Sequence, residues 1–302
     1  MSETSAALAP MDWLFAGLLL DPFIEFGFMR RALAGCVALS LSAAPVGVFL
    51  LLRRMSLTGD AMSHAILPGA ALGYLVAGLS LGAMTLGGIV AGLLVAVASG
   101  LVARNTVLRE DASLAAFYLL SLALGVLIIS VQGNNVDLLH VLFGTVLALD
   151  NAALTLLGSI AALSLLALAL LYRPLVLECL DPVFLRSVSR WSPVAHYGFL
   201  ALLVINLVAG FHALGTLMAV GILVLPAATA RFWVRRLGPL LLLATALALL
   251  ACLAGLLISF YANWPTSPLI VLCLGVAYLS SMLLAPHGLL RHQRPAATHL
   301  RA

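Results

Sequence analysis

The sequence predicts an all-α protein, a polytopic bundle of transmembrane helices. Of its 302 residues, 64% are hydrophobic and only 9% are charged, whereas a soluble domain is about 25% charged. Several apolar runs exceed the roughly 18 residues that mark a membrane-crossing helix. These runs are continuous rather than alternating, which excludes a transmembrane β-barrel.

Each expected span is close to the roughly 20 residues that a membrane-crossing helix needs. About eight or nine spans are predicted, at 33–52, 58–79, 82–103, 113–131, 152–172, 195–211, 213–230, 238–261 and 267–285. The ranges 195–211 and 213–230 meet at Phe211–His212, so either is a candidate for a broken or re-entrant helix. The apolar stretch 136–149 is short, which favours a half-helix or re-entrant segment.

Arginine predicts the orientation in the membrane, because all fifteen basic residues are arginines. Most of them fall on one side of the layout, which the positive-inside rule makes the cytoplasm: Arg53, Arg54, Arg104, Arg109, Arg173, Arg186, Arg190, Arg231, Arg235, Arg236 and the tail arginines. Arg30 and Arg31 fall on the other side, so either residues 13–29 form an extra crossing or they lie flat at the outer surface. The acidic and proline interruptions favour the second, and residues 1–32 are interpreted as an N-terminal interfacial segment. Residues 33–286 form the expected transmembrane domain, and 287–302 a disordered cytoplasmic tail despite His287, His292 and His299.

Composition also excludes several functions. Without lysine there is no Walker A nucleotide site and no lysine Schiff base, so any ATP hydrolysis belongs to a partner chain. No HExxH motif occurs, and the adjacent Ser63 and His64 do not face each other on a helix, which argues against an intramembrane enzyme. The net charge of +4 reflects topology, and no nucleic-acid partner is expected. Cys36, Cys179, Cys252 and Cys273 are too scattered for a metal or redox motif and are interpreted as packing residues.

Asp60 and His64 are the candidate site, because ionisable side chains deep in a membrane usually face a cavity or a partner. At about 1.5 Å per residue, they lie roughly 10 Å and 16 Å beyond Arg53 and Arg54. Their i,i+4 spacing puts both on one helix face. Pro68 removes the backbone bond to the His64 carbonyl, which predicts a kink beside the imidazole. Gly69 and Gly73 form a GxxxG pattern for close helix approach.

Spacing alone leaves three roles open for the pair: a structural hydrogen bond, a proton relay, or part of a metal path. Carboxylate and imidazole together suit zinc and are acceptable for manganese. Two ligands are too few for a closed zinc site, which needs four. Two copies of the helix meeting across a dimer axis would supply four.

Other polar residues are weaker candidates. Asp137 and His140 lie near the outer face, where they guide a metal inward, contact a delivery protein, or cap and position the half-helix. His212 lies at the outer junction of two spans, either as a residue for metal entry or as an interface histidine with a structural partner. Asp181 and Pro182 form a helix start. The residues that follow place Phe184 and Arg186 on different faces of a short amphipathic helix, within a cytoplasmic segment at about 178–192. This helix either couples to a partner or lies on lipid.

Five ordered motifs carry a resemblance to a known family. They are "VGVFLLLRRMSLTGDAMSHAILPGAALGYL", "REDASLAAFYLLSLALGVLIIS", "DLLHVLFGTVLAL", "ECLDPVFLRSVS" and "LGTLMAVGILVLPAATAR". Together they closely resemble the membrane permeases of bacterial zinc/manganese ABC importers, over roughly residues 30–286. One departure is Leu185, where alanine is usual.

The resemblance implies a type II ABC importer-like permease in the bacterial cytoplasmic membrane. It implies a second copy of the chain, two cytoplasmic ABC ATPase subunits, and a periplasmic or lipid-anchored protein that delivers Zn²⁺ or Mn²⁺ as cargo, with no permanently bound cofactor. Asp60 and His64 match its metal-path motif. Asp181, Pro182, Phe184 and Arg186 match its coupling segment.

A proton-coupled secondary metal carrier is the alternative function, in which Asp60 and His64 relay protons. It would need no ATPase. The residues do not separate zinc from manganese or ferrous iron, because Asp and His ligate all three.

Overall fold

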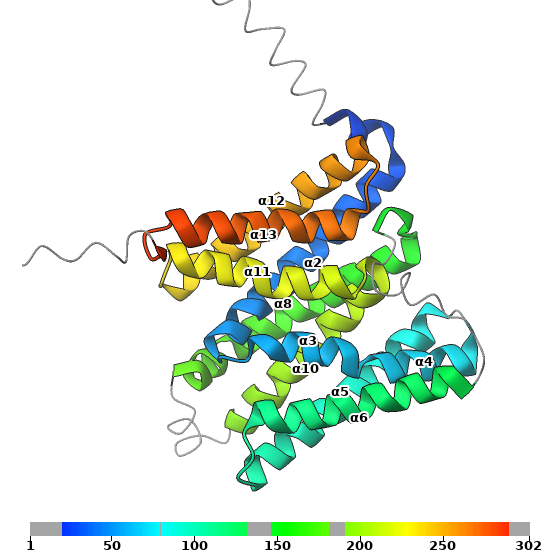
Figure 1. Ribbon diagram of the computed structural model, residues 1–302, viewed down its shortest axis with the longest axis vertical. Coiled ribbons are helices and arrows are strands. Elements are labelled where there is room, and N and C mark those ends of the chain that lie inside the picture. The colour runs from blue at the N-terminus through cyan, green and yellow to red at the C-terminus, as the bar shows by residue number, and fades with distance from the viewer. Residues whose placement is uncertain (1–19, 79, 132–145, 181–190, 290–302) are drawn as a thin grey trace, which may run out of the picture.

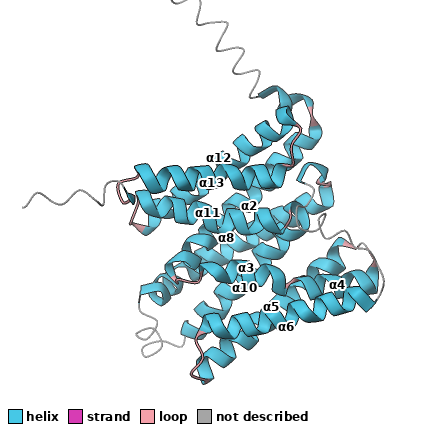
Figure 2. Ribbon diagram, viewed as in Figure 1, coloured by secondary structure: helices cyan, strands magenta, loops and turns pink. Residues whose placement is uncertain are grey.

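The computed structural model describes residues 20–78, 80–131, 146–180 and 191–289, and this part of the chain consists of helices joined by loops, with no strand (Figure 2). Residues 20–25 form a short helix before the main bundle. The elements that follow are α2 (Gly27–Leu52), α3 (Ser56–Ala65), α4 (Leu67–Ala77), α5 (Leu81–Asn105), α6 (Glu110–Val131), η1 (Val146–Ala148), α8 (Asn151–Leu180), α10 (Trp191–Leu214), α11 (Thr216–Trp233), α12 (Leu237–Ala262) and α13 (Thr266–Leu284).

Eight of these helices are long and apolar enough to cross a membrane. A further crossing is divided between α3 and α4, of 10 and 11 residues, which together occupy the predicted span 58–79. The predicted polytopic helical bundle is therefore confirmed.

Burial separates the central helices from the outer ones. In the apolar window of α2, and equally in that of α10, 72% of the residues are buried, against 22% for α6 and 28% for α8. α2 packs against α8, α11 and α12, and α10 packs against α8 and α5 (Figure 1). The core of the described chain therefore forms around α2 and α10, and the outer faces of α6 and α8 are left for lipid or for other chains.

Small residues set the closest helix contacts. A Cβ at Gly69 would overlap the carbonyl oxygen of Gly87, and a Cβ at Gly73 would overlap that of Ala83, so α4 and α5 touch backbone to backbone. Gly47 makes the same kind of approach from α2 to Leu223 of α11. The predicted GxxxG face is thus used inside one chain, where glycine allows close van der Waals packing.

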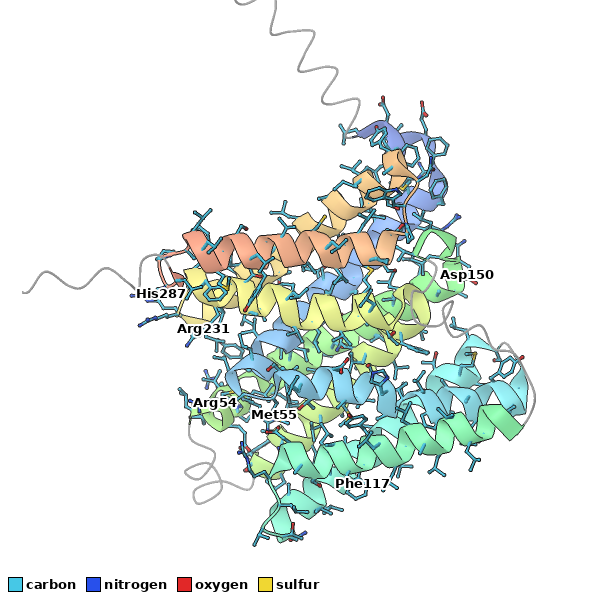
Figure 3. The ribbon with its side chains drawn as sticks, in the orientation of Figure 1. Arg54, Met55, Phe117, Asp150, Arg231 and His287 are labelled. Carbon is cyan, nitrogen blue, oxygen red and sulfur yellow. The ribbon has the colours of Figure 1, made fainter. Side chains whose placement is uncertain are left out.

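The predicted orientation agrees with the ends of the bundle. Figure 3 shows Arg54, Arg231 and His287 at one end and Asp150 at the other. Arg31, which departs from the charge pattern, donates from Nε to the Leu149 carbonyl at 3.0 Å and ties the start of α2 to the end of η1. A structural hydrogen bond thus accounts for an arginine on the outer side.

Several helix ends differ from the predicted spans. α2 begins at Gly27 rather than at 33, and α8 continues to Leu180 rather than ending at 172, because Pro174 is accommodated inside the helix. The two doubtful ranges near Phe211–His212 are neither broken nor re-entrant. Instead, α10 and α11 are separate continuous helices, and the chain turns between them at Gly215, whose φ of 89° suits glycine.

Candidate functional site

The candidate site is carried by the broken helix formed by α3 and α4. α3 ends at Ala65, and Pro68 is the second residue of α4, where its missing N–H is tolerated. Ile66 joins the two with φ −75° and ψ −29°, so the backbone stays helical through the break. The Ala65 carbonyl accepts a hydrogen bond from Ser121 Oγ of α6 at 3.0 Å. The break beside His64 is therefore present as predicted, and α6 supports it.

The structure brings Asp60 and His64 together on α3. His64 Nε2 lies 4.0 Å from Asp60 Oδ1, which is too long for a hydrogen bond. Two ligand atoms on one tetrahedral or octahedral ion lie roughly 3.0–3.5 Å apart, given bonds of roughly 2.0–2.2 Å. A small rotation of either side chain would therefore allow both to bind the same ion.

Both side chains are open on the surface of a single chain. The Asp60 side chain is 66% exposed and that of His64 is 35% exposed, and Leu57 on the same face is 83% exposed. The opposite face of α3 is packed, with Thr58 and Met62 buried and Gly59 against the Leu223 side chain of α11. One face of α3 thus packs on the bundle through side chains, while the face that carries the pair remains uncovered.

The other candidate residues are less completely placed. His212 lies in the last turn of α10, but its side chain is outside the described part of the chain, as are all of Asp137, His140, Asp181, Pro182, Phe184 and Arg186. Residues 178–180 of the expected coupling segment lie in α8, and 191–192 lie in α10. Within the described residues, no group of three or more His, Cys, Asp and Glu side chains could hold a metal ion.

Sequence reasoning overlooked a second polar contact, between Arg53 and His196. The Nη2 atom of Arg53 lies 2.6 Å from His196 Nδ1. The guanidinium carbon of the same arginine lies 5.0 Å from the centre of the Phe199 ring. His196 is only 3% exposed. The available signal was a histidine at the start of an apolar span, a position where ionisable residues have specific partners.

The architecture and the site define a class of protein: a multi-pass membrane transport subunit built around a broken helix with an ionisable pair. The chain matches the ABC 3 transport family over residues 25–285, and it belongs to that family. It is therefore a permease subunit of an ABC transporter in the bacterial cell membrane, as the motif resemblance implied.

Individual relatives cover nearly the whole chain. The manganese import system permease protein ScaB of Streptococcus parasanguinis is 35% identical over 267 residues, which are 88% of this chain and 94% of that protein. The chelated iron transport system membrane protein YfeD of Yersinia pestis is 31% identical, over 90% of each chain. Among solved structures, PsaBC from Streptococcus pneumoniae in complex with Fab superposes with a TM-score of 0.78 at 30% identity, covering 91% of this chain and 97% of that one.

Proposed function

We propose that this chain is the membrane-spanning permease of an ATP-driven importer of a divalent metal ion, manganese or zinc. The observation that carries the proposal is the Asp60–His64 pair on the open face of α3, with its two ligand atoms 4.0 Å apart. The relatives named for manganese import and chelated-iron transport support a metal as cargo. Family membership does not favour the alternative of a proton-coupled secondary carrier.

A second copy of the chain is part of the proposal. A carboxylate facing lipid near the middle of a membrane costs about 2.5–3.5 kcal/mol on insertion scales, so the open face of Asp60 calls for a polar passage or a partner. Two ligands from one chain and two from its copy would complete a four-coordinate site. A two-fold axis beside α3 would provide this arrangement, because such an axis brings the same patch of both copies together.

The energy for transport comes from a partner in this proposal. The chain has no lysine, and hence no Walker A motif. Cytoplasmic ABC ATPase subunits would bind ATP and move the permease through the segment containing Asp181, Pro182, Phe184 and Arg186. An external metal-binding protein would deliver the ion at the opposite end of the bundle.

In this proposal Asp60 and His64 bind the metal ion reversibly and carry out no reaction on it. Asp60 supplies negative charge to a divalent cation, and His64 supplies a nitrogen ligand only while its imidazole is neutral, so protons compete with the metal. Release requires the affinity of the site to differ between the outward-open and inward-open states, because a ligand shifts an equilibrium only by its differential affinity.

Reconstituted transport tests this function. The chain is assembled in proteoliposomes with its ATPase and its metal-binding protein, and uptake of radioactive ⁵⁴Mn or ⁶⁵Zn is followed with ATP supplied on the ATPase side. We expect Asp60→Asn and His64→Ala to lower uptake at least tenfold while the protein remains in the membrane.

The matched control is Asp111→Asn. Asp111 is an exposed carboxylate that pairs with Arg109 at 3.7 Å, and its loss should leave uptake unchanged. Normal uptake by the double variant Asp60→Asn/His64→Ala would refute the site. Uptake driven by a proton gradient without ATP would refute the importer and favour the secondary carrier.

A further inference from the structure

We infer that the Arg53–His196 contact is a mechanical link that makes the end of α2 and the start of α3 follow the cytoplasmic start of α10. Arg53 and His196 thereby couple the movement of α3 to that of α10, acting through the backbone rather than by touching the metal or by setting its affinity at rest. This inference rests on the proposed function for its meaning in transport.

The contact has the chemistry of a durable link. Arginine has only donors, so the guanidinium donates to His196 Nδ1, which holds the imidazole as an acceptor at that nitrogen. The same guanidinium lies 5.0 Å over the ring of Phe199, three residues further along α10 and fully buried. A hydrogen bond and a cation–π contact thus hold one arginine on one face of α10.

The surroundings shield this contact from water. His196 is 3% exposed and packs edge-on against Tyr197 at 5.1 Å between ring centres. Glu178, near the end of α8, is 4% exposed, and both Arg53 and Glu178 act electrostatically on the Cys179 thiol. The histidine end of this bond is buried and Arg53 is partly buried, and a charge-assisted hydrogen bond is stronger where the local dielectric is low than in water.

The position of the contact joins two parts of the proposed mechanism. His196 lies in the second turn of α10, which begins at Trp191 directly after residues 181–190. Arg53 follows α2, and α3 begins only three residues later at Ser56, with Asp60 in its second turn. The connection between α2 and α3 is a tight turn, with Arg54 at a φ of 58°. In this inference, motion of the start of α10 reaches the helix of Asp60 and His64 through the Arg53–His196 contact and this short turn, in addition to the direct packing of α10 on α2 and α3.

The transport experiment compares two variants. His196→Leu roughly keeps the side-chain volume but removes the nitrogen that accepts the hydrogen bond from Arg53, whereas in His196→Asn the Oδ1 atom can accept in place of Nδ1. We expect His196→Leu to lower the metal transported per ATP hydrolysed at least tenfold. His196→Asn should stay within about threefold of the wild type, because it restores the hydrogen bond. Binding of Mn²⁺ to Asp60 and His64 without ATP should be the same in all three proteins.

Asn206→Leu is the matched control for a merely structural effect. Asn206 is an equally buried polar residue on α10 that donates to Ser164 Oγ of α8 at 2.9 Å, so its loss should lower thermal stability without changing transport per ATP. The inference would be overturned if His196→Leu left the metal transported per ATP unchanged, or if Asn206→Leu lowered it equally. Either result would leave the proposed function standing.

A distance measurement tests the link without relying on transport. Spin labels are placed at Ser56→Cys on α3 and Val194→Cys on α10, in a chain whose four cysteines are replaced by alanine and which is diluted with unlabelled copies. The distance distribution should be narrow with His196 or His196→Asn and broad with His196→Leu. Equal widths in all three would overturn the link even if no metal were transported.

Discussion

At the scale of single residues, some polar side chains of this protein form structural hydrogen bonds, whereas others are exposed and free to bind a ligand. Asp150 accepts a hydrogen bond from the Ala153 N–H at 2.7 Å and caps α8, and Asn206 bonds Ser164 between two helices. Asp60 and His64 have no such bond to each other, and their face is open. Side chains that are costly in a membrane and that remain exposed, without a hydrogen bond to each other, are candidates for function rather than for stability.

The ligand pair predicts how metal preference can be altered. Replacing His64 by Asp exchanges an imidazole, which suits zinc, for a carboxylate, which suits manganese. We expect zinc to compete with ⁵⁴Mn uptake at least fivefold less effectively in His64→Asp than in the wild type. The measurement is the zinc concentration that halves uptake. An unchanged value would mean that His64 does not contact the ion.

At the scale of helices, close glycine contacts give the broken helix a rigid support. α4 cannot shift against α5 without losing the backbone contacts of Gly69 and Gly73, whereas α3 is held by side chains of α11 and α6. Gly125 of α6 also packs against the ring of Pro68. The half of the broken helix beyond the proline is thus fixed, and the half that carries Asp60 and His64 has looser surroundings.

A pair of glycine substitutions tests this support. Gly69→Ala should destabilise the chain by about 1–3 kcal/mol, because its Cβ would overlap the backbone of Gly87. The control Gly82→Ala lies on α5 where a Cβ meets nothing within 4 Å, and it should be neutral or stabilise by about 0.5–1 kcal/mol. Thermal unfolding in detergent measures both. Equal midpoints would show that α4 and α5 are not in close contact.

At the scale of the whole molecule, one face of α3 is not covered by any other helix of the described chain. A charged side chain and a large apolar one, Asp60 and Leu57, share this face. The core helices α2 and α10 are already enclosed by their neighbours. The proposed assembly therefore covers α3, with the cytoplasmic ATPase at the arginine-rich end.

Cross-linking in native membranes tests the covered face. Leu57→Cys should form a cross-linked pair of chains with a short bismaleimide, in a background without the four native cysteines, because the proposed two-fold axis passes beside α3. Leu272→Cys, on α13 and 62% exposed, should not cross-link. A dimer with Leu272→Cys alone would move the interface from α3 to α13.

Local properties of the sequence were enough to predict the bundle, its orientation and the candidate pair. The length of apolar runs predicts the spans, and the placement of arginines predicts the orientation. The i,i+4 spacing predicts that Asp60 and His64 share a helix face. All three patterns can be read from the sequence because they involve residues that are close together along the chain. Pro68 likewise predicted an interruption of the helix beside His64, and the structure divides the helix two residues further on, at Ile66. The predicted span 152–172 ended too early, since α8 continues to Leu180 with Pro174 inside it, and a proline can be accommodated where surrounding helices support it.

The sequence by itself determined that this protein crosses a membrane as a helical ABC permease and carries a carboxylate–imidazole pair beside a helix break. Only the tertiary structure decided that the face of Asp60 is open, that α2 and α10 are central, and that Arg53 meets His196. Those three features depend on which helix surfaces pack together. Packing brings together residues far apart in the chain, and no local pattern encodes their contact.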